Sequence, residues 1–302
     1  MQATDELNAL LSLIDDPDAE VYATVSGRLM DYGKPIIPEL ENLWENQPDQ
    51  MVQERIELII RRLQLAELVD ELKNWREVGA EDLLKGALLA GKFEQPNLDF
   101  ASIAAELESL KKSIWLELNN FLTPLEQAKV MKNILYHHFE LKGTLLELSQ
   151  PDEFFLHNVI RQKKGNILTN GILYQYLCHQ LNIKTALIDI SGMYLLAFYS
   201  SDYTLDSSNR PHREAIQFFV DPLIGQPLSH QDIDRYLQRM NRIPEPSYFF
   251  PLSNLKIIQL LFHEAAVCFR KNTNDHQKAE ELNILAHQLY LADCAAKKNI
   301  HD

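Results

Sequence analysis

Apolar residues recur at helical spacing through the first half of the chain. Leu7, Leu10 and Ile14 stand at i, i+3 and i+7, which is one face of a helix. Asp16 and Pro17 end that helix and begin the next, because Asp caps a helix and Pro suits its first turn. The chain therefore starts with short amphipathic helices joined by tight breaks.

The same spacing predicts further helices up to about residue 160. Thr123-Pro124-Leu125-Glu126 has the form of a capping box with Pro in the first turn, a specific start signal. The helices expected in this region cover about 36–44, 51–75, 83–88, 100–119, 123–139 and 152–160.

From residue 183 the apolar pattern becomes β-rich. The runs 185–190 and 194–199 are separated by Ser191-Gly192, which predicts a hairpin, and 215–220 predicts a third strand. A polar loop is expected at 201–213. Ser229 then caps a helix to about residue 240, and two helices at about 253–271 and 276–295 finish the pattern.

Composition and charge exclude several classes of protein. The chain has 302 residues and a net charge of -14, so its field repels phosphate backbones and anionic membrane surfaces. No apolar run reaches the roughly 18 residues of a membrane span, and no basic leader precedes the first helix. Three cysteines without metal-like spacing fit a reducing compartment. We expect a cytoplasmic protein that binds neither nucleic acid nor membrane.

A basic turn, a helix start and an acid-ended strand suggest a reaction centre. Residues 161–165 form the turn, residues 166–181 the helix, and the third strand ends at Asp221-Pro222. A helix N-terminus beside two strands, with an acid after the second, is an arrangement that activates a thiol.

Residues from about 124 to 240 resemble the bacterial SirB-type branch of the transglutaminase-like superfamily. The segments that carry the resemblance are 154–160, 161–165, 168–181, 191–195 and 220–223. The resemblance implies a mostly helical α+β protein with a papain/transglutaminase-like core, in which a helix packs on a small antiparallel sheet. N-terminal helical hairpins and a C-terminal helix pair would flank this core.

The first helices, around residues 15–21 and 33–40, also resemble one HEAT-type repeat. Such a unit cannot bury its own apolar face, so we expect it to dock on the rest of the chain. The domains expected are a helical N-terminal region at 1–122, a transglutaminase-like core at 123–245, and a C-terminal helix pair at 246–302. A plain helical hairpin remains the alternative for the first region.

The resemblance assigns three catalytic positions, of which two have lost their chemistry. Thr169 stands in place of the nucleophilic Cys, Met193 in place of the His, and Asp221 in place of the orienting acid. A thioether binds no proton at neutral pH and cannot act as a base. Asp221 also suits a purely structural role, as the cap of a turn that leaves a strand. We therefore do not expect an enzyme.

The remaining candidates describe a pocket without a metal or cofactor. Cys178 lies nine residues after Thr169 on the same predicted helix, which places it on the opposite face. The histidines lack the spacing of a zinc site. The predicted pocket residues are Asn166, Thr169, Asn170, Met193, Tyr194 and Asp221.

Three functions stay open on these residues. The first is a non-catalytic, pseudoenzyme-like module that binds or regulates a protein or peptide partner through a degenerate active-site pocket. The second is a weak hydrolase or acyltransferase that uses Thr169 with an unforeseen base. The third is a helical-repeat adaptor in which the core is a scaffold. The sequence alone does not indicate an oligomeric state.

Overall fold

The computed structural model describes residues 2–203 and 213–298, so part of the expected loop at 201–213 and the end of the chain lie outside the described residues. The chain divides into two compact units, Met1–Asn74 and Trp75–Asp302. Both expected domain boundaries, after residues 122 and 245, fall inside the second unit. The structure is mostly helical with small sheets, which confirms the α+β class.

The first unit is built from helices at the predicted places. They are α1 (Gln2–Leu11), α2 (Ala19–Tyr32), the short η1 (Lys34–Ile36), α3 (Ile37–Asn46) and the first part of α4 (Gln50–Glu77). The side-chain cap of α2 is Asp18 and not Asp16, because the Asp18 carboxylate accepts from the backbone N–H of Glu20. The buried residues of this unit form one apolar core, which includes Ile14, Leu29, Leu40 and Ile56.

The second unit surrounds one central helix with shorter ones. Its helices up to the sheet are α5 (Leu83–Lys92), α6 (Phe100–Glu117), α7 (Pro124–Lys132), η2 (Asn133–His138), η3 (Leu146–Leu148), η4 (Pro151–Phe154), α8 (Leu156–Gln162) and α9 (Ile167–Gln180). The predicted capping box at Thr123 is present, with reciprocal bonds between Thr123 and Glu126. Two short parallel strands, β1 (Lys142–Thr144) and β2 (Lys164–Asn166), precede α9.

A four-stranded antiparallel sheet has the order β3-β4-β5-β6. Its strands are β3 (Thr185–Ile190), β4 (Met193–Tyr199), β5 (Ile216–Asp221) and β6 (Gln226–Leu228). Ser191 and Gly192 join β3 to β4 with φ values of 54° and 91°, which a two-residue hairpin turn of the primed type requires. The strand β6 is not among the predicted elements, because three residues that include a proline carry no β pattern.

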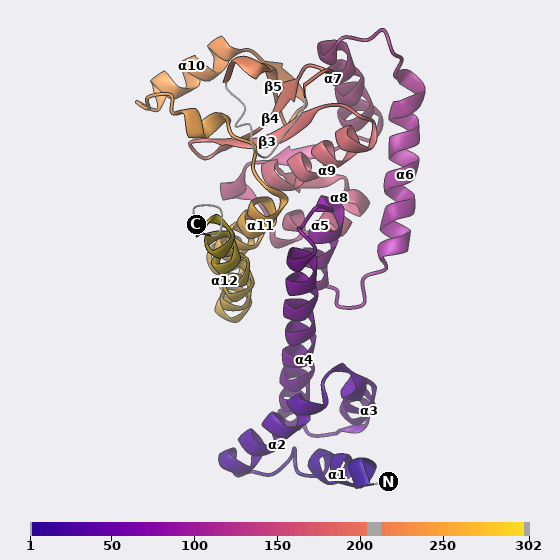
Figure 1. Ribbon diagram of the computed structural model, residues 1–302. Helices are drawn as coiled ribbons and strands as arrows, with labels where there is room; N and C mark the ends of the chain where they lie inside the picture. Colours follow the sequence, from indigo (N-terminus) through magenta and orange to yellow (C-terminus); the bar gives the residue numbers. More distant parts are fainter. Residues whose placement is uncertain (1, 204–212, 299–302) are drawn as a thin grey trace. The chain divides into compact units, whose positions relative to one another are not determined.

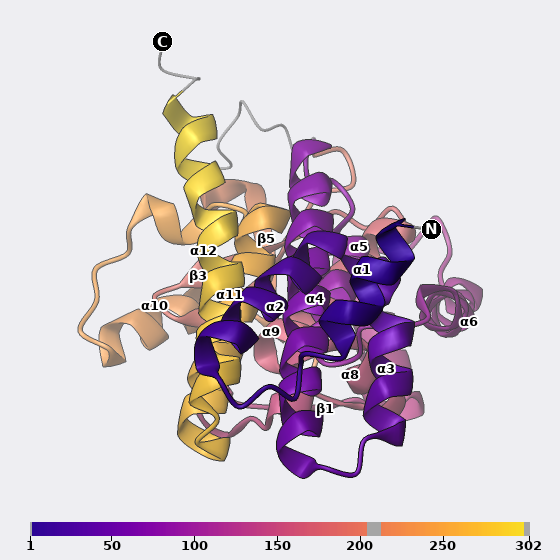
Figure 2. The ribbon, with the colours of Figure 1, turned by 90° about the horizontal axis from the view of Figure 1, so that it is seen from below.

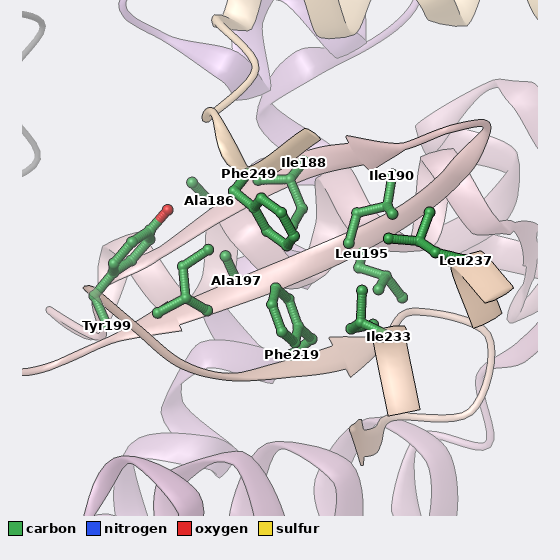
Figure 3. Packing of buried hydrophobic residues seen from close by; sticks show 11 residues of the cluster. Ala186, Ile188, Ile190, Leu195, Ala197, Tyr199, Phe219, Ile233, Leu237 and Phe249 are labelled. Atoms are coloured by element: carbon green, nitrogen blue, oxygen red, sulfur yellow. The ribbon is translucent and has the colours of Figure 1, made fainter. Parts of the chain in front are cut away.

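The two faces of the sheet pack against different helices. On one face lies α9, where Gly171 approaches the Leu187 side chain and the Tyr174 ring meets Phe198 at a centroid distance of 6.2 Å. The other face holds an apolar cluster that the sheet shares with Ile233 and Leu237 of α10 (His230–Arg239) (Figure 3).

The outer edge of β3 is occupied by groups from outside the sheet. The backbone N–H of Leu187 donates to Oε1 of Gln175 at 2.6 Å, and its carbonyl accepts from the N–H of Leu252 at 2.8 Å. Leu187 pairs with Leu196 of β4 in the register, and its own backbone groups face away from that strand.

The final helices are η6 (Pro246–Phe249), α11 (Asn254–Cys268), η7 (Phe269–Thr273) and α12 (His276–Lys298), with the 3-10 turn η5 (Arg213–Ala215) before the third strand. Helices α11 and α12 lie side by side in both views (Figures 1 and 2). Among the helices described, none is long and apolar enough to cross a membrane.

Candidate functional site

The start of α9 is closed by a side chain of its own sequence. Asn166 adopts extended backbone angles, and its Oδ1 accepts from the backbone N–H groups of Leu168 and Thr169 at 3.0 and 2.9 Å. Its Nδ2 donates to the carbonyl of Glu153 at 3.1 Å. The backbone donors that would hold an anion at a helix N-terminus are therefore engaged by the Asn166 cap.

The hydroxyl of Thr169 points into the protein. The residue has no exposed surface, and Oγ1 donates to the carbonyl of Glu153 at 2.7 Å. Oγ1 also lies 3.0 Å from Oδ1 of Asn166, the same oxygen that caps the helix. A hydroxyl held in this way meets η4 and no solvent, so an external acyl group has no path to it.

Glu153 supplies backbone, not acid-base chemistry, to this site. The residue is 2% exposed, and its Oε1 lies 2.5 Å from Nζ of Lys164, so the buried carboxylate is paired as an ion. Neither carboxylate oxygen forms a hydrogen bond with the Thr169 hydroxyl. The carboxylate is thus not placed to remove a proton from Thr169.

Met193 lies on the far face of the sheet from α9. It is partly buried against the apolar cluster that faces α10, in register with Ile190 of the same cluster. Side chains of a strand alternate between the two faces, so the next residue, Tyr194, takes the α9 side. The structure therefore does not bring Met193 to Thr169, and even a histidine at this position would face away from the start of α9.

Tyr194 offers no base in its place. The side chain is 4% exposed, and burial raises the pKa of its phenol, with the carboxylates of Asp189 and Glu264 acting in the same direction. The phenol therefore stays protonated at neutral pH.

Asp221 shapes the turn after β5. Its Oδ1 accepts from the N–H of Leu223 at 2.8 Å, and the hydroxyl of Tyr136 donates to the neighbouring carbonyl of Pro222 at 2.6 Å. Burial raises the pKa of Asp221, while the bond from Leu223 opposes that rise. These contacts are those of the structural role, in which the acid fixes a turn.

The predicted pocket is filled by the protein itself. Asn166, Thr169 and Asn170 have no exposed surface, and Nδ2 of Asn170 donates to the carbonyl of Lys142 at 3.3 Å. These three residues lie together around η4 and β1, whereas Met193 belongs to the other side of the sheet. The six predicted residues therefore do not line one open cavity.

Other nucleophiles and ligands do not complete a site here. Cys178 is fully buried, and burial raises the pKa of its thiol far above neutrality, so the thiolate does not form. The residues that the structure describes contain no group of three or more His, Cys, Asp or Glu side chains arranged for a metal ion.

A surface groove outside the predicted site was not indicated by the sequence. It lies between α6 and η2, and its lining includes Leu110, Leu116, His138 and Phe139. The exposed Leu116 is the one signal in the sequence, because it continues the apolar content of α6 outside the buried stripe.

Comparison with known proteins gives one match. A family model described as the transglutaminase-like superfamily matches residues 101–263, which is more than half of the chain. The matched range contains α9, the whole four-stranded sheet and α10. No curated protein and no solved structure matches the chain.

Proposed function

The chain belongs to the transglutaminase-like superfamily, and we propose that it uses this fold to bind a protein or peptide partner and not to transfer acyl groups. The hydrogen-bonded burial of Thr169 carries this proposal. The hydroxyl at the nucleophile position is inaccessible, and its bond goes to a backbone carbonyl.

The absence of a base at that position supports the same conclusion. A threonine hydroxyl needs a general base within about 3 Å to become a nucleophile. The hydrogen-bond partners that the structure gives Oγ1 are a carbonyl and an amide oxygen, and neither takes a proton at neutral pH. Loss of such partners in acyl-transfer enzymes costs several powers of ten in rate.

The partner we propose is a protein or peptide in the cytoplasm. A net charge of -14 disfavours nucleic acid and anionic membranes. Within the superfamily, the order of the segments at 161–165, 191–195 and 220–223 supports assignment to the SirB-type branch. The break at Gly33 and Pro35 between α2 and α3 supports a HEAT-like origin for the first helices.

One observation favours a second candidate, the helical adaptor. Seven of the eleven residues that line the groove between α6 and η2 belong to α6, which lies in the helical region expected at 1–122. In this version, helices outside the sheet make the contact with the partner and the core holds them in place.

The experiment removes the Thr169 hydroxyl without changing side-chain shape. Thr169→Val and wild type are incubated with an activated acyl ester and with a glutamine-containing peptide, and product release and intact mass are measured. We expect equal rates and no acyl adduct, because the hydroxyl is buried. Thr185→Val is the matched control, since this buried threonine lies in β3 and its hydroxyl has no hydrogen-bond partner among the described residues. An acyl adduct on wild type that disappears in Thr169→Val, and not in Thr185→Val, would contradict the proposal.

A further inference from the structure

Helix α6 contacts the second unit through a narrow stripe. Its buried residues, Ile103, Leu107, Leu110 and Ile114, follow one line along the helix, and the rest of its surface is exposed or partly exposed. Both views place α6 at the margin of its unit, with a loop at each end (Figures 1 and 2). A helix held along one line leaves both of its flanks available for other contacts.

One flank of α6 forms a groove of about 590 Å³ with η2. Its apolar lining comes from α6, η2 and α8, and includes Leu107, Leu110, Ile134 and Ile160, all of them buried. Leu116, which is 67% exposed, also lines the groove and lies in the last turn of α6. Apolar lining beneath an exposed leucine is typical of grooves that receive a partner's side chains.

The second wall of the groove is a π-helix. The N–H of Phe139 donates to the carbonyl of Ile134 at 2.8 Å, five residues earlier. This wider turn brings Ile134, His138 and Phe139 to one face, and all three line the groove. π-helical turns are less favourable than α-helical ones and are kept most often at functional sites.

Two unpaired carboxylates mark the α6 wall. Glu106 and Glu117 line the groove and have no ion-pair partner among the described residues. They are eleven residues apart on one helix, which corresponds to about three turns and roughly 16 Å. The positive charge of Lys163 lies on the opposite wall, with Nζ 5.4 Å from the centre of the Phe139 ring. The negative rim thus belongs to α6.

We propose that this groove binds an amphipathic helix of a protein partner. Apolar side chains of that helix enter between α6 and η2, and two of its basic residues, about three turns apart, pair with Glu106 and Glu117. The inference rests on the proposed binding function and gives it a location and a partner chemistry. Acidic groups on the rim disfavour an anionic lipid surface as the occupant.

The test uses a synthetic peptide as the probe. A fluorescein-labelled helix of about 18 residues carries leucines at helical spacing along one face and two lysines three turns apart. Fluorescence anisotropy measures its affinity for the full chain. A second peptide has glutamates in place of both lysines, and a third has the same composition in scrambled order.

Three protein variants locate the binding. Glu106→Lys with Glu117→Lys reverses the rim, and Ser113→Trp fills the groove from an exposed position on α6. Glu41→Lys with Glu45→Lys makes the same change of net charge on exposed positions of α3 and is the matched control. Circular dichroism verifies that each variant is folded.

We expect the lysine peptide to bind wild type and the α3 control equally. Each groove variant should weaken this binding about tenfold or more, and the reversed rim should prefer the glutamate peptide. Absence of binding to wild type overturns the inference, as does equal weakening in the α3 control, which would show attraction to net charge alone. Tight binding of the scrambled peptide also overturns it. Acylation at Thr169 is a separate readout, so a failure here is distinguishable from a failure of the proposed function.

Discussion

Three residues at the start of α9 determine what this protein can do chemically. Asn166 caps the helix, Thr169 bonds to a carbonyl, and Glu153 provides that carbonyl. Each polar group is satisfied by another part of the same chain, as buried polar groups in folded proteins require. The position that holds a nucleophile in an acyl-transfer enzyme is here a hydrogen-bonded joint between η4 and α9.

A buried histidine near this joint gives a testable dependence on pH. His157 is 1% exposed, and burial lowers its pKa from 6.5 to about 4, with Arg161 adding to the effect and Asp152 opposing it. Because the folded pKa is the lower one, this stabilisation is complete above pH 6.5 and is lost as the pH falls through 4. We expect His157 to contribute about 2 kcal/mol to the loss of unfolding free energy, less than the roughly 3 kcal/mol of the full shift, because Glu94 lies 3.6 Å from its Nε2.

Urea unfolding at several pH values measures this contribution. His157→Gln should lose less stability than wild type between pH 7 and pH 4, whatever its stability at neutral pH. His137→Gln is the control, since His137 is exposed on η2. The same pH slope in wild type and His157→Gln would show that another group titrates.

At this scale, the sequence predicts which residues occupy the motif positions and not where they point. Thr169 and Asp221 lie at a helix start and a strand end, as their motif order indicates. Alternation along β4 makes Met193 and Tyr194 face opposite sides, but which side α9 covers depends on packing between distant segments. The burial of Thr169 likewise depends on η4, sixteen residues earlier in the chain.

The elements differ in how strongly the local sequence determines them. The capping box at Thr123 and the hairpin at Ser191-Gly192 carry specific turn chemistry, and both are found. The π-helix η2 has no such signal, because an α-helix and a π-helix begin with the same apolar spacing and differ in tertiary contacts. The parallel pair of β1 and β2 is equally silent, since each strand has three residues.

Close packing between β2 and α9 predicts an intolerant glycine. A Cβ atom at Gly165 would clash with Oδ1 of Asn170 and lie 2.8 Å from a methyl carbon of Val159. Gly165→Ala should therefore reduce the free energy of unfolding by about 2 kcal/mol or more, as overpacked substitutions do. Urea unfolding followed by circular dichroism measures the change.

Gly27 provides the matched control for this substitution. It lies within α2, and a Cβ atom there would meet nothing within 4 Å. Gly27→Ala should stabilise the chain by up to about 1 kcal/mol, because alanine is the better helix former. Equal effects of the two substitutions would mean that the contacts at Gly165 are not what constrains it.

For the whole molecule, the division into two units predicts two unfolding steps. The unit Met1–Asn74 is the smaller, and small units bury a lower share of their surface. Trp75 is 1% exposed in the second unit, whereas Trp44 belongs to the first. In a chain with Trp44→Phe and Trp115→Phe, fluorescence reports the second unit, and circular dichroism reports helices of both.

We expect the circular dichroism signal of that variant to begin falling at a lower urea concentration than the fluorescence signal. Wild type should give the same circular dichroism curve, because Trp44 and Trp115 are 36% and 63% exposed and contribute little to either core. Coincident curves from the two probes would instead indicate a single cooperative transition.

The occupied margin of β3 has a consequence for this protein at high concentration. An open strand margin is a template on which another molecule can extend a sheet, and this is a route to amyloid-like fibres. At Leu187 both outward backbone groups are already bonded, to the Gln175 side chain and to Leu252. Copies of this chain that meet in a crowded solution thus find no free ladder at the centre of that strand, and Gln175 guards it from within the very helix whose first turn was once suited to chemistry.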